Sequence, residues 1–217
     1  LQLKTIPKVN FLLMEKLLAE GNEMIIGLTG PAQSGKDSFF LLAKDYFNSF
    51  NIKIKRIALA DNLKKDLNQF ILDKFSIDIF NAKSEDKELI RDLMVVYGKI
   101  KRQQTEGKYW TNLIKKEIED AKDTDIIFIT DIRYAYYPED ELSWLKSYKK
   151  NMLIHISRLD KNNLIIPPRN SEEAHNDPVL KNASDLQLCW HTTEDTNLRK
   201  KEAELILNKI YENYRSR

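Results

Sequence analysis

MIIGLTGPAQSGKDSFFLLAKDYF, residues 24–47, is the stretch that decides the fold. It begins with an apolar run typical of a buried strand, and it ends with apolar side chains at helical spacing. Between the two, residues 30–36 read GPAQSGK, a turn bounded by two glycines and closed by a lysine. A buried strand, a glycine-bounded turn and an amphipathic helix in this order predict the first β–α unit of a parallel sheet.

The turn fits the phosphate-binding pattern G-x-x-x-x-G-K, in which backbone N–H groups attract an anion and the lysine follows the outer phosphates. The pattern normally continues with a serine or threonine that binds Mg²⁺. Here Asp37 follows Lys36, and the hydroxyl comes one place later, at Ser38. The alternative is a loop that only resembles the pattern. We expect ATP to bind along the whole loop, at Gly30, Pro31, Ala32, Gln33, Ser34, Gly35, Lys36, Asp37 and Ser38.

The composition excludes several classes of protein. The 217 residues carry a net charge of +2, which is too small for a dedicated nucleic-acid binder. The single cysteine, Cys189, excludes a disulfide framework and a cysteine-based metal site. No apolar run approaches the ~18 residues of a membrane span. We therefore expect small-molecule nucleotides as partners, with no nucleic acid and no membrane, in a reducing cytoplasm. Residues 1–23 are expected to be a helical extension, and residues 24–217 a single domain.

Strands and helices alternate along the rest of the chain. Further strands are predicted at residues 52–60, 125–131, 151–158 and 185–191, and helices at residues 63–75, 87–104, 109–122 and 198–217. Residues 160–184 are polar and contain Pro167, Pro168 and Pro178, which predicts an irregular segment. The alternation predicts a three-layer α/β fold, a parallel sheet flanked by helices. In such a sheet, ligands bind beyond the carboxyl ends of the strands.

Charged residues follow the predicted strand at residues 125–131. Asp131 ends this strand, where a carboxylate can hold Mg²⁺ directly or through water, or can cap the next turn. Together with Ser38 and Asp37 it makes the candidate metal site. Arg133 lies two residues further on, and its guanidinium can fork around a phosphate or form a surface ion pair.

Other arginines are placed to neutralise charge during phosphoryl transfer. Arg91 and Arg102 lie on one predicted helix, where they either clamp the phosphate of an acceptor or are solvated. Arg158 and Arg169 lie within residues 158–184, which we expect to form a small mobile lid that excludes water. The candidate catalytic side chains are Lys36, Arg91, Arg133, Arg158 and Arg169.

Five segments together resemble a known family. They read GPAQSGKDS, IALADNLKKDL, RDLMVVYGKIKR with a later YW, FITDIRYAYYPEDEL, and NSEEAH with a later ASDLQLCW. From about Met24 to the C-terminus, the chain resembles the bacteriophage-type deoxynucleoside monophosphate kinases, which belong to the adenylate-kinase-like P-loop kinases. The most specific elements are G-K-D-[ST] and the D-[IV]-R tripeptide after an apolar strand. RDLMVVYGKIKR departs from the leucine-glutamine version of this helix that is usual in the family, and this departure weakens the case for Arg102.

The resemblance implies a reaction and a division of the site. These kinases move the γ-phosphate of ATP to a deoxynucleoside monophosphate, with Mg²⁺ as cofactor. By resemblance, Lys36 and the loop amides hold the donor, and the residues on the acceptor side are Asp61, Lys64, Arg91, Arg102 and Arg133. The resemblance also implies a viral source and therefore the host cytoplasm. It leaves a homodimer open.

Asp37 needs an explanation, because a carboxylate beside bound phosphates is costly. Adjacent helix residues diverge by about 100°, so Asp37 and Ser38 cannot both occupy the usual hydroxyl position. We hypothesise that Ser38 lies near the metal-bound phosphate, while Asp37 faces the acceptor and holds metal-bound water or braces an arginine. The simpler reading is an acidic residue at a helix N-terminus, worth about 0.3–1 kcal/mol.

Two rival functions stay open at this point. One is a P-loop kinase of another phosphorylated acceptor, such as phosphomevalonate, which the same arginines would suit. The other is a nucleotide-binding regulatory ATPase, which would hydrolyse ATP slowly without an acceptor.

Overall fold

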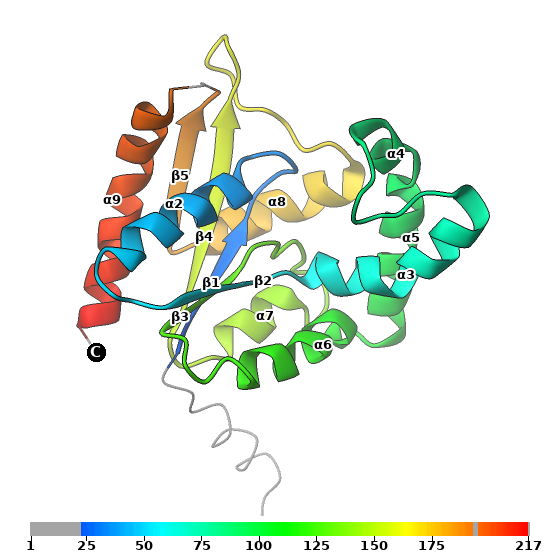
Figure 1. Ribbon diagram of the computed structural model, residues 1–217, viewed down its shortest axis with the longest axis horizontal. Helices are drawn as coiled ribbons and strands as arrows, with labels where there is room; N and C mark the ends of the chain where they lie inside the picture. The colour runs from blue at the N-terminus through cyan, green and yellow to red at the C-terminus, as the bar shows by residue number, and fades with distance from the viewer. Residues whose placement is uncertain (1–22, 193–194, 217) are drawn as a thin grey trace, which may run out of the picture.

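A parallel sheet of five strands runs through the centre of the residues that the computed structural model describes, which are 23–192 and 195–216 (Figure 1). The strand order is β2-β3-β1-β4-β5, and each neighbouring pair is parallel. The strands are β1 Met24–Thr29, β2 Ile54–Ile57, β3 Ile126–Ile129, β4 Asn151–Leu159 and β5 Leu186–His191. All five predicted strands are confirmed, and so is the predicted three-layer fold.

Helices cover both faces of the sheet. In chain order they are α2 Lys36–Asn48, α3 Leu59–Phe75, α4 Ser84–Leu89, α5 Arg91–Gln104, α6 Lys108–Glu119, α7 Glu141–Lys146, α8 Ser171–Ala183 and α9 Thr196–Arg215. Helices α2 and α9 lie against one face, whereas α6, α7 and α8 lie against the other (Figure 1). None of the helices in the described part of the chain is long and apolar enough to cross a membrane.

The two hydrophobic cores follow from the alternation of side chains along the central strand β1. Ile26 and Leu28 face the core beneath α2 and α9, while Ile25 faces the core beneath α6, α7 and α8. All three are buried, and each fully buried aliphatic side chain stabilises the fold by about 1.5–3 kcal/mol. The apolar character of β1 on both faces, visible in the sequence, is thus explained by its central position.

A separate lobe made of α3, α4 and α5 lies beside the sheet (Figure 1). It has its own small core, formed by Leu67, Ile71, Ile77, Ile79 and Ile90. Because β2 ends at Ile57 and α3 begins at Leu59, this lobe starts at the carboxyl edge of the sheet. It therefore borders the region where the predicted phosphate loop lies.

Three boundaries differ from the sequence-based expectation. Residues 160–184 were expected to be irregular, but α8 occupies 171–183 even though Pro178 lies inside it. The Asn170 side chain accepts a hydrogen bond from the Glu173 N–H and so caps the helix, and tertiary contacts outweigh the missing proline donor. The helix expected at residues 87–104 is divided into α4 and α5, which meet at Ile90, and the Ile90 side chain is buried in the lobe core.

The third difference concerns Asp61, which was expected just after a strand and lies instead in the first turn of α3. The short helix α7 was not anticipated from the sequence at all. The predicted helical extension at residues 1–23 lies outside the described residues, apart from Glu23.

Candidate active site

The glycine-bounded turn forms a loop between β1 and α2, at the carboxyl edge of the sheet. Gly30 has φ +123° and Gly35 has φ +95°, conformations that side chains other than glycine rarely adopt. A β-carbon at Gly35 would also lie 2.5 Å from the Trp190 ring. The two glycines of the motif are therefore required by backbone geometry.

Lys36 is the first residue of α2 and folds back over the loop. Its Nζ donates hydrogen bonds to the carbonyl oxygens of Gly30 at 2.7 Å and Pro31 at 2.8 Å. Burial, and then the nearby Arg133 charge, lower the pKa of Lys36 to about 8, against the opposing influence of Glu173. An amine with this pKa still carries its charge at pH 7, so Lys36 supplies a positive charge at the centre of the loop.

The last strand holds the loop in shape. Trp190 of β5 donates from Nε1 to the Ser34 carbonyl oxygen over 2.6 Å, and this bond is buried. The indole ring also meets Phe39 of α2 edge to face, with ring centroids 6.4 Å apart. The sequence analysis did not identify this contact, because nothing local links residues that lie 156 positions apart.

Three arginines gather at the loop: two bond Gln33 of the loop, and the third pairs with Glu173 of α8. Arg158, near the end of β4, donates to the Gln33 carbonyl oxygen at 3.3 Å, and Arg169 forms a hydrogen bond to the Gln33 side chain. Arg133 pairs with Glu173 at 3.3 Å. Four of the five candidate catalytic side chains thus gather here: Lys36, Arg133, Arg158 and Arg169.

The fifth, Arg91, connects to this group through Glu88. Arg91 is the first residue of α5, and its Nη2 lies 2.8 Å from a Glu88 carboxylate oxygen. The same oxygen is 3.9 Å from Nη1 of Arg169. The α4–α5 lobe is therefore joined by ion pairs to the arginine that holds the tip of the loop.

Asp131 follows β3 and caps the start of α3. Its two carboxylate oxygens accept from the Leu59 N–H at 2.8 Å and the Ala60 N–H at 2.6 Å. Burial raises the pKa of Asp131. Asp131 was considered as a cap of the next turn in the chain, but the turn it caps begins at Leu59, 72 residues earlier. The contact also joins the strand-end carboxylate to α3, the helix that carries the predicted acceptor-side residues Asp61 and Lys64.

The turn that carries Arg133 rests on a buried carboxyl group. Glu141 of α7 accepts from the backbone N–H of Arg133 at 2.6 Å and from that of Tyr134 at 3.2 Å. Burial raises the pKa of Glu141 to about 8, so this carboxyl is mostly protonated at pH 7. Sequence reasoning missed Glu141, because it lies on the short helix that was not anticipated.

Asp37 points away from the centre of the loop. Its Oδ1 lies 3.5 Å from Nε of Arg56, and the Asp37 side chain is 80% exposed. Arg56 also bonds Asp61 at 3.0 Å, and Asp61 bonds Lys64 at 2.9 Å. Asp37 is thus joined through Arg56 to two of the five predicted acceptor-side residues, Asp61 and Lys64. Arg56 is a further site candidate that the sequence gave no reason to select, since it lies within a strand of alternating lysines and isoleucines.

Arg102 has a different environment from the one expected. It is only 4% exposed, and its guanidinium bonds both oxygens of the buried Asp140 at 3.2 Å. The guanidinium also lies 3.3 Å from the centroid of the Tyr134 ring. These contacts use the guanidinium within the protein interior, and the burial of the Arg102 side chain argues against an acceptor-binding role. Arg102 instead supports the segment between β3 and α7.

The loop and its neighbours offer only part of a coordination shell for Mg²⁺. Among the described residues, no group of three or more His, Cys, Asp or Glu side chains is arranged to hold a metal ion. Each oxygen of Asp131 already accepts one hydrogen bond and retains a second lone pair, which suits contact through metal-bound water. The remaining candidate ligands are the Ser38 hydroxyl and the exposed Asp37 carboxylate. Such a set fits an ion that is held chiefly by phosphates.

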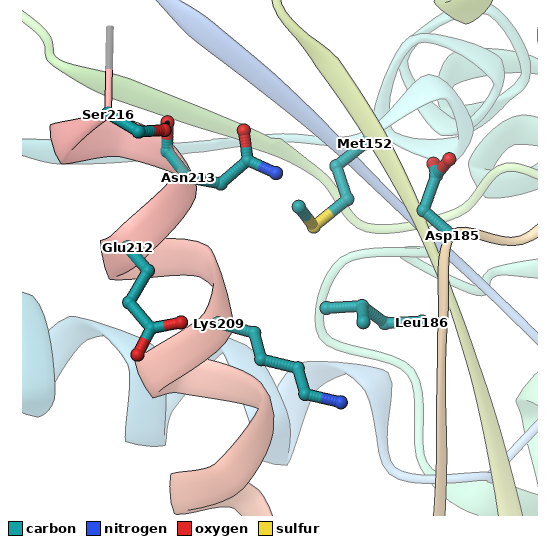
Figure 2. Close-up of a pocket in the computed structure, with 7 residues that line it drawn as sticks. All are labelled: Met152, Asp185, Leu186, Lys209, Glu212, Asn213 and Ser216. Atoms are coloured by element: carbon teal, nitrogen blue, oxygen red, sulfur yellow. Dashed lines mark hydrogen bonds between the residues drawn. The ribbon is translucent and has the colours of Figure 1, made fainter.

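Two hollows lie at the opposite, amino edge of the sheet. One, of about 590 Å³, is bordered by the starts of β4 and β5 and the end of α9 (Figure 2). Its lining residues are Met152, Asp185, Leu186, Lys209, Glu212, Asn213 and Ser216. The other, of about 710 Å³, is lined by residues that include Lys53, Asp125 and Tyr214. Neither hollow includes a residue of the loop, so we assign the candidate site to the carboxyl edge, where parallel sheets bind ligands.

Comparison with solved structures gives distant similarities, among them two bacterial kinases. Dephospho-CoA kinase from Campylobacter jejuni is 14% identical, with a TM-score of 0.44 over 86% of this chain and 96% of that chain. Shikimate kinase from Bacteroides thetaiotaomicron is 11% identical, with a TM-score of 0.40 over 87% of this chain and 98% of that chain. The sequence matches no protein-family model and no curated protein. At these identities, neither enzyme's substrate is carried over to this chain.

Proposed function

We propose that the protein is a P-loop kinase that transfers the γ-phosphate of ATP to a nucleoside 5′-monophosphate, with a deoxynucleotide as the preferred acceptor. The observation that carries the proposal is the gathering of Lys36, Arg133, Arg158 and Arg169 around one glycine-bounded loop. Phosphoryl transfer depends mainly on positioning and on neutralising charge, which is what such a group supplies.

The donor and the acceptor would lie on opposite sides of the loop. The loop amides and Lys36 would hold the β- and γ-phosphates of ATP. The acceptor would lie toward Arg56, Asp61 and Lys64, which form a connected ion-pair network at the start of α3. The choice of a deoxynucleoside monophosphate rests on the sequence resemblance.

The reaction is an in-line displacement. An oxygen of the acceptor phosphate forms a bond to the γ-phosphorus as the bond from that phosphorus to the β,γ-bridging oxygen breaks, and ADP leaves. The acceptor phosphate is already an anionic nucleophile, so no general base is required. Arg133 would balance the charge of the transferring group. Ser38, Asp37 and Asp131 are the residues that would hold Mg²⁺ or its water, and the bound ion would neutralise phosphate charge.

The test is ADP release from Mg·ATP in the presence of each common deoxynucleoside and ribonucleoside monophosphate, beside a reaction without acceptor. We expect at least one nucleotide to stimulate ADP release strongly. Lys36→Ala should abolish the stimulation. Lys44→Ala, which removes an exposed lysine from the same helix, should retain it.

Other outcomes point to the rival functions. If no nucleotide stimulates the reaction, the acceptor assignment is wrong, and phosphomevalonate becomes the next acceptor to try. Rapid ADP release without any acceptor would instead favour a regulatory ATPase.

A further inference from the structure

The carboxylate of Glu173 lies in the phosphate loop. One of its oxygens accepts from the Ala32 backbone N–H at 3.3 Å and from the Arg169 N–H at 3.2 Å. Its other oxygen lies 3.3 Å from a guanidinium nitrogen of Arg133. The side chain is only 13% exposed, so these contacts are largely shielded from water.

Two of these contacts, with Ala32 and Arg133, are not ones that the local sequence favours. Glu173 lies in the first turn of α8, three residues after the N-cap Asn170. An acid at this position commonly folds back onto the N–H of its own N-cap residue. Glu173 bonds the backbone N–H of Arg169, one residue before the N-cap, and the same oxygen also reaches the Ala32 N–H of a loop 141 residues away in the sequence.

The groups that hold Glu173 are those that an anionic ligand would need. Ala32 belongs to the loop whose N–H groups would face a phosphate, and Arg133 is the arginine proposed to balance the charge of the transferring group. Glu173 also raises the pKa of Lys36, although burial and the Arg133 charge leave it lowered overall. The Glu173 carboxylate therefore accepts from the Ala32 N–H, pairs with the Arg133 guanidinium and favours the charged form of Lys36. A phosphate oxygen at this position would do the same.

We infer that Glu173 is an internal substitute for phosphate, which occupies the loop in the free protein and must leave when a polyphosphate binds. The inference rests on the proposed function and adds a regulatory device to the same site. A phosphate oxygen and the carboxylate compete for the Ala32 N–H and for Arg133, and their negative charges repel each other.

Displacement of the carboxylate has a structural consequence. Glu173 and Arg169 are both tied to the loop and belong to the start of α8 and the segment before it. The middle of α8 is held by a different contact, because Asp177 forms a hydrogen bond with the buried His155 of β4 at 3.0 Å. Release of Glu173 would therefore remove its bonds to Ala32 and to the Arg169 backbone, while Arg169 keeps its bond to the Gln33 side chain and the remainder of the helix stays in place. Ligand binding at the loop and the position of Arg169 are coupled in this way.

Glu172→Gln provides a matched control for Glu173→Gln. Glu172 is the preceding residue on the same helix turn and carries the same charge, but it pairs with Lys99 at 2.8 Å and has no contact with the loop. Both substitutions remove one negative charge from the start of α8. A difference between them reports the contact with the loop.

The experiment has two readouts on the full chain. In the free protein, amide hydrogen exchange at Ala32 should be faster in E173Q than in E172Q. In titrations with inorganic tripolyphosphate, E173Q should bind about tenfold more tightly than E172Q, because a charge-assisted hydrogen bond no longer has to be given up. If E173Q does not fold, Glu173→Asp shortens the reach of the carboxylate at constant charge, and the same two changes are expected.

Each outcome decides a separate point. Equal Ala32 exchange in the two variants would show that the carboxylate does not hold the loop, and the inference would be wrong. Faster exchange with unchanged or weaker tripolyphosphate binding would make Glu173 a support of the site rather than a competitor. If the wild-type protein and both variants fail to bind tripolyphosphate, the proposed function fails together with the inference.

Discussion

The buried carboxyl of Glu141 should make the stability of the protein fall as the pH rises. Its pKa is raised by burial from 4.5 to about 8. The folded protein therefore binds a proton that the unfolded chain has lost in this pH range. The contribution is fully present below pH 4.5 and is lost as the pH rises toward about 8.

The magnitude follows from the size of the shift. Each pH unit inside this window should lower the free energy of unfolding by about 1.4 kcal/mol. The whole shift from 4.5 to about 8 then corresponds to about 5 kcal/mol. Between pH 5 and pH 7 alone, about 2.7 kcal/mol should be lost.

Glu141→Gln should remove this dependence. The glutamine oxygen can still accept from the N–H groups of Arg133 and Tyr134, while its amide group replaces the protonated oxygen. We expect the stability of the variant relative to wild type to rise by about 2.7 kcal/mol between pH 5 and pH 7. The assay is urea unfolding at fixed pH values from 5 to 9, with Glu172→Gln as a control for the loss of one charge. Parallel curves for wild type and E141Q would refute the reasoning, because they would mean that Glu141 is ionised in the folded protein.

Three further substitutions test the contacts around the loop. Trp190→Phe removes the donor to the buried Ser34 oxygen and should cost about 1–3 kcal/mol in unfolding experiments, with weaker ATP binding by calorimetry. Asp131→Asn leaves one of two buried amides at the start of α3 without an oxygen, and a loss of about 1–3 kcal/mol is expected; an unchanged unfolding midpoint would contradict the capping role. Asp37→Asn breaks an exposed pair with Arg56 and should cost less than about 1 kcal/mol, yet raise the KM of the acceptor. Unchanged turnover and Mg²⁺ dependence in D37N would exclude the bracing role.

The sheet could be predicted from the sequence because its signals are local. Each strand is a short apolar run between turn residues, and the glycine pattern of residues 30–36 fixes the first connection. The course of residues 160–184 could not be predicted in the same way. Pro178 suggests an interruption, whereas the Asn170 cap and the bond between Asp177 and His155 of β4 hold the helix together. The second of these contacts exists only after the strands have assembled.

The residues of the candidate site also fall into those that local sequence patterns predict and those that depend on contacts remote in sequence. Lys36 and the loop were identified from spacing alone, and the arginines at the strand ends followed from the expected architecture. Glu141, Glu173 and Arg56 were missed, because each acts through a partner that is remote in sequence or through an element too short to detect. Arg102 shows the opposite error. Its charge suggested that it binds the acceptor phosphate, but its guanidinium is buried in an ion pair with Asp140, which lies 38 residues away in the sequence.

The odd carboxylate after Lys36 can now be weighed against the charges around it. Asp37 is exposed and turned toward Arg56, so its repulsion of a phosphate in the loop is weakened by solvent and by a neighbouring cation. Glu173 is shielded and turned into the loop, so its repulsion of the same phosphate is much less reduced. Of the two, it is therefore Glu173 that a bound polyphosphate must displace, while Asp37 can remain in place and hold Arg56 on the acceptor side. If this division is correct, D37N and E173Q should act on different ligands: the first on the acceptor, and the second on the polyphosphate donor.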